Sequence, residues 1–277
     1  MSTRVHLSSR LRSRLTKVLV LVRLAFKRPL EAYDNAQMQT QVLRESQSHR
    51  SASHPTVGWN EARQTLIHHL NIAPTVLHEK PLLDIEREVA RRREELPSDL
   101  PWGLEFDADI SLARCVYLLS RALRPTVVVE TGVAYGVTTA FLLTSLEVNG
   151  RGRLESIDLP PLTAEPERYI AALVPPGLRS RWHFHRGSSR RLLPSVLRKE
   201  PIDMFVHDSE HTYDNMRREF ATVWDYLRPG GAVVADDVGG NPAFDELMLK
   251  KDVALAIVIG EIAKSHSKFG VVLKSAS

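Results

Sequence analysis

Thr-Val-Val-Val-Glu-Thr-Gly-Val-Ala-Tyr-Gly, residues 126–136, is the stretch that decides the fold. A short β-branched run ends in Glu130, and Gly132 and Gly136 then open a segment, Val137 to Glu147, that predicts a helix. A buried strand that enters a helix through a glycine turn presents backbone amides to a ligand in α/β sheets. Glycines in the turn lack the Cβ atoms that would keep a ligand and the helix away. An acid at the strand end suits a cationic or hydroxyl-rich ligand, whereas a phosphate site favours lysine.

Apolar strands and amphipathic helices alternate from this point to the end of the chain. The predicted strands lie at 127–130, 153–157, 182–185, 202–207, 232–235, 253–259 and 269–273, with helices at 137–147, 166–173, 190–197 and 211–227. This alternation predicts an α/β fold with a doubly wound, mostly parallel, seven-stranded Rossmann-like sheet that binds ligands at the carboxyl ends of its strands. The last two strands are joined by a short polar loop, which permits a hairpin and one antiparallel strand.

Composition and charge narrow the class of protein. With 277 residues and 43% hydrophobic content, the chain can bury one large core and still carry an extension. A single cysteine excludes an intramolecular disulfide framework and fits a reducing compartment, so we expect a cytoplasmic protein. Residues 1–30 hold eight Lys or Arg and no acid, which leaves 29 basic and 33 acidic residues in the rest. A slightly acidic body makes a nucleic-acid enzyme unlikely.

The first 30 residues form a separate pattern. Apolar residues recur at helical spacing opposite basic ones, at Leu7, Leu11, Leu15, Val18 and Val22 against Arg10, Arg14 and Lys17. This indicates a basic amphipathic arm, whose apolar run is too short to span a bilayer. Three interpretations remain open: packing on the body or on a partner subunit of a homo-oligomer, peripheral contact with a membrane, or an organellar presequence. The predicted divisions are this arm over 1–30, a helical and loop extension over 31–107, and the main domain over 108–277.

Polar residues follow the second and third predicted strands. Asp158 ends the second strand, where an acid can accept hydrogen bonds from both hydroxyls of a ribose. Ser188 and Ser189 follow the third strand after Gly187, where small polar residues can face a flat base. Such polar residues are common in loops. They indicate a ligand site only because they follow successive strands of the same predicted sheet.

Acids gather after the fourth and fifth predicted strands. Asp208 follows one strand, and Asp236 and Asp237 follow the other. If these strands are neighbours, three carboxylates converge, and a bound cation such as Mg²⁺ resolves their repulsion. Helix capping is the structural alternative for such acids. His211 is placed to act as a general base, because neutral imidazole accepts a proton near neutral pH.

These blocks together resemble the class I S-adenosylmethionine-dependent methyltransferases over about residues 108–275. The similarity is strongest to enzymes like catechol O-methyltransferase and to their bacterial relatives that act on sugars and antibiotics. The blocks that carry it are residues 129–136, 156–158, 187–189, 207–213 and 227–237. The resemblance implies S-adenosylmethionine as cofactor, a divalent cation, and a small molecule with a hydroxyl group as methyl acceptor.

The resemblance also implies roles for individual residues. The implied cofactor-binding residues are Glu130, Thr131, Gly132, Gly136, Asp158, Ser188, Ser189 and Asp208. Asp208, Asp236 and Asp237 are the implied metal ligands, and Asp208 and His211 the catalytic residues. His211 stands where catechol-type enzymes carry a lysine, and Asp237 where they carry asparagine, so the base and the acceptor differ from theirs. Two other functions remain open: an NAD(P)-dependent oxidoreductase, and a non-catalytic module that binds at a membrane.

Overall fold

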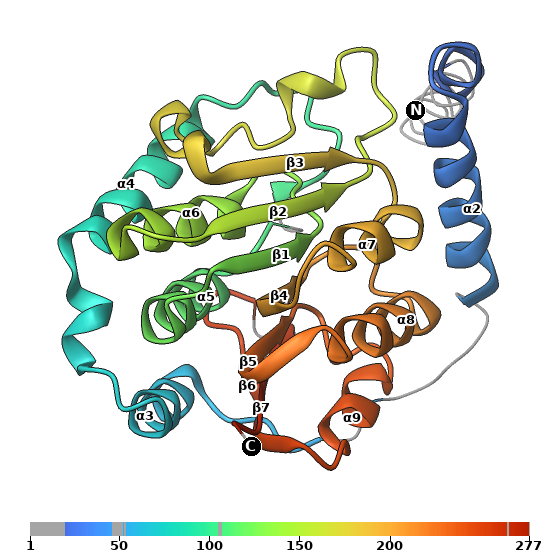
Figure 1. Cartoon of the computed structure of the whole chain (residues 1–277). Helices are drawn as coiled ribbons and strands as arrows, with labels where there is room; N and C mark the ends of the chain where they lie inside the picture. Colours follow the sequence, from blue (N-terminus) through green and yellow to red (C-terminus); the bar gives the residue numbers. More distant parts are fainter. Residues whose placement is uncertain (1–19, 46–51, 53, 105–106, 265, 277) are drawn as a thin grey trace, which may run out of the picture.

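The computed structural model describes residues 20–45, 52, 54–104, 107–264 and 266–276. At its centre is a seven-stranded sheet in the order β3-β2-β1-β4-β5-β7-β6 (Figure 1). The strands are β1 Val127–Thr131, β2 Arg153–Asp158, β3 Trp182–Arg186, β4 Ile202–His207, β5 Leu227–Ala235, β6 Val253–Gly260 and β7 Lys268–Lys274. β7 is antiparallel to both of its neighbours, and the pairs among β1 to β5 are parallel. The predicted mixed sheet with one antiparallel strand is therefore confirmed.

Helices cover both faces of the sheet (Figure 1). On one face pack α3 Trp59–His69, α4 Lys80–Glu94, α5 Ile110–Leu123 and α6 Val137–Asn149, with a 3-10 turn at Pro74–His78. On the other pack α7 Ser189–Leu197, α8 Tyr213–Trp224 and α9 Ala243–Met248. Alternate residues of a strand enter different layers, so Val128 joins the first core cluster and Val127 and Val129 the second.

The first described segment of the chain, residues 20–45, lies apart from these layers. Residues 20–27 are helical, and α2 Pro29–Glu45 follows beside α7 and α8 at the carboxyl edge of the sheet (Figure 1). Most of the predicted basic arm, residues 1–19, falls outside the described residues. None of the helices in the described part of the chain is long and apolar enough to cross a bilayer.

Two predicted elements differ from the structure. The helix expected over 166–173 is a single 3-10 turn, Pro166–Arg168, because Ala171 adopts a left-handed backbone with φ of 53°. The helix expected over 211–227 is shorter, since α8 spans Tyr213–Trp224 and β5 already begins at Leu227. Gly230 and Gly231, expected in a turn, lie inside β5.

A candidate cofactor and metal site at the carboxyl edge

The register of the parallel strands brings the predicted site residues to one edge. Thr131 pairs with His207, and His207 pairs with Ala235, so β1, β4 and β5 end at the same level. The ladder continues past the strands: the Asp208 amide donates to the Thr131 carbonyl and the Asp236 amide to the His207 carbonyl, both at 2.8 Å. Asp208 and Asp236 thus start adjacent loops.

Gly132 is required by the same close approach. Its φ is +85°, and a Cβ there would lie 1.9 Å from the carbonyl oxygen of Asp208. Gly136, with φ of +91°, has a different neighbour, since a Cβ would lie 2.7 Å from a Val174 methyl. The first glycine therefore lets β1 and β4 continue side by side, and the second lets α6 pack on the 171–174 loop.

A cavity of about 260 Å³ lies above the ends of β1, β2 and β4. Five of the eight predicted cofactor residues line it: Gly132, Asp158, Ser188, Ser189 and Asp208. The Asp158 carboxylate accepts hydrogen bonds from the amides of Val133 and Ala134 at 3.1 and 2.9 Å, which fixes the glycine turn against β2. Burial raises the pKa of Asp158 to about 6, although these amides oppose the shift.

The other three predicted cofactor residues do not line this cavity. Gly136 packs on the 171–174 loop as described. Thr131 is fully buried, and its hydroxyl donates to Glu219 at 2.6 Å. Glu130 is fully buried beneath the turn and accepts hydrogen bonds from Thr139 at 2.9 Å and Ser156 at 2.7 Å. These residues shape the site from below, and direct contact with a cofactor remains a prediction for them.

We expect Glu130→Gln to stabilise the ligand-free protein at alkaline pH. Burial raises the pKa of Glu130 from 4.5 to about 7, so the folded state favours the protonated carboxyl and loses stability as pH rises through this interval. An amide cannot ionise, so the variant should exceed the wild type by on the order of 2 kcal/mol above about pH 8 and match it near pH 5. Urea unfolding at the two pH values measures this. An equal effect from Glu147→Gln on the exposed face of α6 would contradict it.

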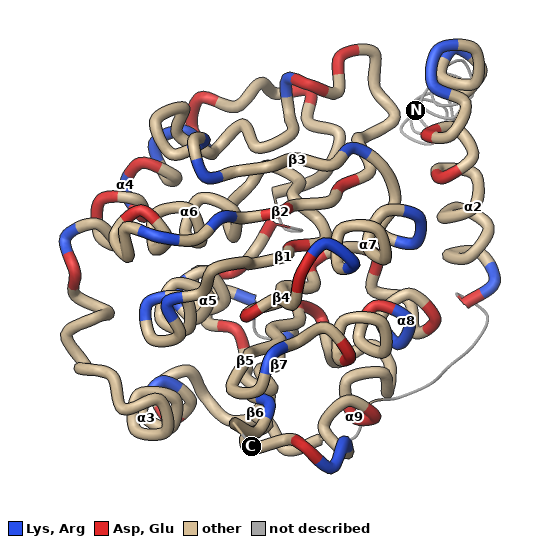
Figure 2. The backbone as a smooth tube through the Cα atoms, viewed as in Figure 1, with Lys and Arg blue, Asp and Glu red and all other residues tan. Residues whose placement is uncertain are grey.

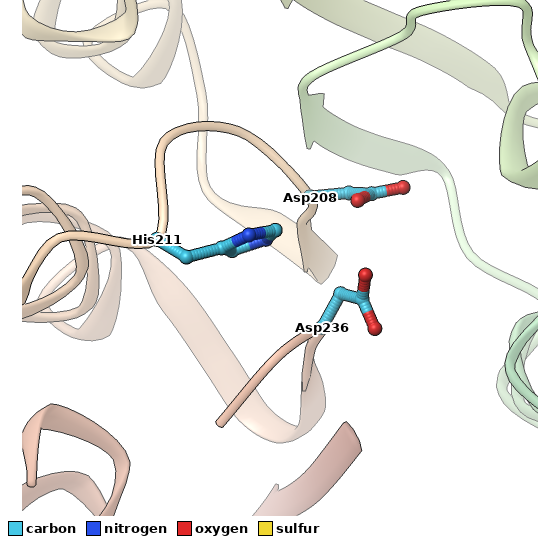
Figure 3. Close-up of side chains that lie close together, drawn as sticks. All are labelled: Asp208, His211 and Asp236. Carbon is cyan, nitrogen blue, oxygen red and sulfur yellow. The ribbon is translucent and has the colours of Figure 1, made fainter. Parts of the chain in front are cut away.

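Three side chains form a group suited to a metal ion. Asp208, His211 and Asp236 each offer a ligand atom, and these atoms lie within 4.8 Å of one another (Figure 3). The His211 Nε2 and Asp236 Oδ1 atoms are buried and have no hydrogen-bond partner among the described residues. Burial, and then the charge of Asp236, raise the pKa of Asp208 well above its usual value. Two carboxylates and an imidazole are a donor set that a divalent cation fits.

Asp237 lies outside this group. Its side chain is 55% exposed, and its Oδ2 lies 3.6 Å from the His211 Nδ1. Its φ of 51° turns the chain so that consecutive acids at 236 and 237 point apart. The structure thus brings Asp208 and Asp236 together, adds His211 to them, and leaves ligation by Asp237 as an untested prediction.

A buried hydrogen-bond network supports the loop that carries Asp208. The Glu219 carboxylate is fully buried and accepts from Thr131 Oγ1, Ser209 Oγ and Asn215 Nδ2 at 2.6 to 3.1 Å. It also contacts His207 Nδ1 at 2.8 Å and lies 3.7 Å from the Arg218 guanidinium. Burial alone would raise the pKa of Glu219, but His207 and these donors lower it to about 2. One charged side chain therefore connects the ends of β1 and β4 with α8.

A second, larger cavity of about 550 Å³ lies on the other side of the metal group. Five residues line both cavities: Trp102, Ala134, Asp208, Ser209 and Glu210. Asp236, His211, Glu261 and Lys264 line the larger one. A ligand in the smaller cavity and a second ligand in the larger one would therefore meet beside Asp208.

Helix α2 closes the smaller cavity from outside, a feature that the sequence does not reveal. Acidic positions on α2 lie beside basic positions at α7 (Figure 2). Asp34 pairs with Arg191 of α7 at 2.7 Å and accepts from the Ser188 amide at 3.1 Å. Glu31 pairs with Arg186 at 2.7 Å, and Glu45 accepts from the first amides of α8, those of Tyr213 and Asp214. Asp34, Gln37, Met38 and Gln41 line the cavity.

A family model for a methyltransferase domain matches residues 129–238. This interval runs from β1 past Asp236 and Asp237 and contains every residue predicted for the site. A comparison with curated proteins gives no match.

Solved structures of similar fold include several methyltransferases. The O-methyltransferase TomG from Streptomyces achromogenes, in complex with SAM, has a TM-score of 0.52 and 21% identity, over 71% of this chain and 90% of that one. The SAH-bound methyltransferase PaMTH1 from Podospora anserina has a TM-score of 0.52 and 12% identity, over 81% and 99%. A Klebsiella pneumoniae protein assigned to the O-methyltransferases has a TM-score of 0.52 and 18% identity, over 79% and 98%. At these identities the likeness establishes the fold.

Proposed function

We propose that the chain is an S-adenosylmethionine-dependent methyltransferase that methylates a hydroxyl group of a small molecule with the help of a divalent cation, a proposal that the match to a methyltransferase-domain model supports. The observation that carries this proposal is that the Asp208, His211 and Asp236 donors line the larger cavity, and that Asp208 also lines the smaller one. The two carboxylates suit Mg²⁺ or Mn²⁺, of which we propose Mg²⁺, and the imidazole is the less usual donor for it.

The smaller cavity has the residues to bind the adenosine part of the cofactor. We assign the ribose hydroxyls to Asp158 and the edge of the adenine to Ser188 and Ser189. The Ser188 Oγ is buried without a partner among the described residues, so a ligand can use it. When bound, S-adenosylmethionine would supply a methyl group to the acceptor oxygen and leave as S-adenosylhomocysteine, and the hydroxyl proton would pass to water or to a basic side chain of the site. The acidic floor of the site compensates for the cationic sulfur.

The larger cavity would hold the acceptor. Asp208, Asp236 and His211 would hold the cation, which lowers the pKa of a hydroxyl group bound to it. The loops at 132 and 208 lie in van der Waals contact, so the cofactor turn and the metal group occupy fixed positions relative to each other. Such alignment of two reactants lowers the activation free energy by several kcal/mol.

Cofactor binding is the first test of the proposal. Calorimetry should show S-adenosylmethionine and S-adenosylhomocysteine binding to the full chain, and Asp158→Ala should weaken both by on the order of tenfold or more. NADH serves as the competing ligand, since the glycine turn and Asp158 also suit the oxidoreductase alternative. Binding of NADH without binding of either sulfur compound at about 1 mM would end the proposal.

We expect His211→Gln to weaken metal binding. The side chain lies in the donor group, and a lost ligand lowers metal affinity by on the order of 10²-fold or more. Titration with Mn²⁺ followed by electron paramagnetic resonance measures the affinity. An unchanged Mn²⁺ affinity combined with a lower kcat would instead support the role predicted from the sequence, in which His211 is the base.

Peripheral membrane contact of the arm is a separate proposal. In its described part, Val22 and Phe26 are 51% and 86% exposed beside Arg23 and Lys27. We expect full-length protein to sediment with vesicles of anionic lipid more than a chain lacking residues 1–30 does. Equal sedimentation of the two would favour packing on a partner subunit, and therefore a homo-oligomer.

A further inference from the structure

The larger cavity contains more negative charge than the proposed cation can balance. Besides Asp208 and Asp236, its lining includes four acids and one lysine: Asp107, Glu210, Asp237, Glu261 and Lys264. Asp107 pairs with Arg93 at 2.5 Å, and Lys264 donates to the Asp107 carbonyl at 2.6 Å, so both bases lie on the same side of the cavity. If every carboxyl is ionised, a divalent cation and a sulfonium leave one negative charge over; in the ligand-free protein burial raises the pKa of Asp208, Glu210 and Glu261, so these carboxyls bind protons that cationic ligands would displace.

Glu261 is a buried acid of this cavity that lies close to Asp236 and Lys264. It follows β6 directly and is 7% exposed, yet neither of its carboxylate oxygens accepts a hydrogen bond from the described residues. The ionised form of a carboxyl buried in this way is unfavourable until a cationic or hydrogen-bonding ligand satisfies it.

The position of Glu261 is fixed by its neighbours. The amides of Ile262 and Ala263 donate to the Asp109 carboxylate at 3.3 and 2.8 Å, and the Glu261 amide donates to the Ser267 carbonyl at 3.2 Å. Asp109 is itself the N-cap of α5, so the loop is tied to the core. The carboxyl group is thus held in the cavity wall, close to the carboxylate of Asp236. Burial, and then the charge of Asp236, raise the pKa of Glu261 to about 8.

Aromatic rings complete the same cavity. Trp102 and Tyr135 meet edge to face with centroids 5.5 Å apart, and the Tyr135 hydroxyl donates to the Trp102 carbonyl at 2.7 Å. Both line the larger cavity. Faces of such rings attract cations, and the effect grows when water is excluded.

We propose that the methyl acceptor carries a protonated amine near its reactive hydroxyl, and that Glu261 binds this amine. The proposal rests on the methyltransferase function above and narrows its substrate class to amino alcohols, including amino sugars. An ammonium group would satisfy the buried carboxylate, balance the leftover charge and lie between acidic and aromatic walls. Glu261 is then the residue that determines acceptor specificity.

Two glycosides that differ in one group test the proposal. Methyl α-D-glucosaminide carries an ammonium where methyl α-D-glucoside carries a hydroxyl. We would titrate each into the full chain loaded with Mg²⁺ and S-adenosylhomocysteine and follow binding by NMR. The amino glycoside should bind at least about tenfold more tightly, and Glu261→Gln should remove this preference. Glu147→Gln, on the exposed face of α6, should keep it.

Three results would overturn the proposal: equal affinity for the two glycosides, no binding of the amino glycoside, or an unchanged preference in Glu261→Gln. The N-acetylated glucosaminide removes the charge from the ligand instead of from the protein, so its loss of affinity tests the idea even if the variant fails to fold. The loading step keeps the two proposals separate. If S-adenosylhomocysteine does not bind, the proposed function fails; if it binds and no amine preference appears, this inference alone fails.

Discussion

Replacing Asp208 by asparagine is expected to lower kcat on the order of 10³-fold, or about 4 kcal/mol, while leaving the fold at least as stable as the wild type. The residue lines both cavities and belongs to the metal group, so under the proposed function its charge would serve the cofactor and the cation together. In the absence of ligands the same charge is buried close to those of Asp236 and Glu130. Asparagine keeps the shape and removes this repulsion.

The experiment combines three measurements on one variant. Methyl transfer from radiolabelled S-adenosylmethionine gives the activity, thermal unfolding gives the stability, and the rise in Tm on adding Mg²⁺ reports the cation. Asp225→Asn, at the exposed end of α8, is the matched control. Full activity in Asp208→Asn after chelation would remove the metal from the proposal and leave methyl transfer standing.

The second large effect is expected from Gly132→Ala. The added methyl would meet the Asp208 carbonyl oxygen at 1.9 Å and the Ser209 amide nitrogen at 2.8 Å, both of them backbone atoms that cannot rotate away. The ends of β1 and β4 must separate, so we expect a loss of about 3 kcal/mol or more in stability, together with loss of cofactor binding. Urea unfolding and calorimetry with S-adenosylhomocysteine measure the two effects.

Gly150→Ala separates the two causes of this loss. Gly150 also has a positive φ, of +67°, but a Cβ there meets no atom within 4 Å. Its alanine variant should lose only the cost of the left-handed backbone, about 1 kcal/mol, and bind the cofactor normally. Equal losses in the two variants would show that backbone strain, and not contact with Asp208, makes glycine necessary at 132.

The sheet could be predicted because its strands are signalled locally. Runs such as residues 127–129 and 204–206 are continuously apolar, and the glycine turn after the first marks the switch to a helix. The failure at 166–173 has the opposite cause, since a left-handed Ala171 leaves no trace in the apolar pattern. The ends of helices were also not predictable from the apolar pattern. The predicted helix over 211–227, for example, overlaps the start of β5 at Leu227.

The sequence could predict those site residues that lie at the carboxyl ends of strands. Asp158, Asp208 and Asp236 each end a parallel strand, so topology alone brings them to one edge. Glu261 directly follows strand β6, but its place in the site could not be predicted from the sequence. β6 is separated from β5 by β7, and the distance between Glu261 and Asp236 depends on the conformation of the 261–267 loop. For Asp237 the sequence was misleading in the opposite way. Its neighbour Asp236 lies in the metal group, but the left-handed backbone of Asp237 itself directs its side chain toward solvent.

Helix α2 has a consequence for how long the protein retains its ligands. It contributes no described residue to either core cluster and is held by charged and polar contacts such as Asp34 with Arg191 and Glu31 with Arg186. Contacts of this kind weaken as ionic strength rises, whereas the buried sheet is indifferent to salt. Detachment of α2 would therefore open the smaller cavity to solvent while the rest of the protein stays folded. Under the proposed function, the dissociation rate of S-adenosylhomocysteine should then increase at high salt concentration.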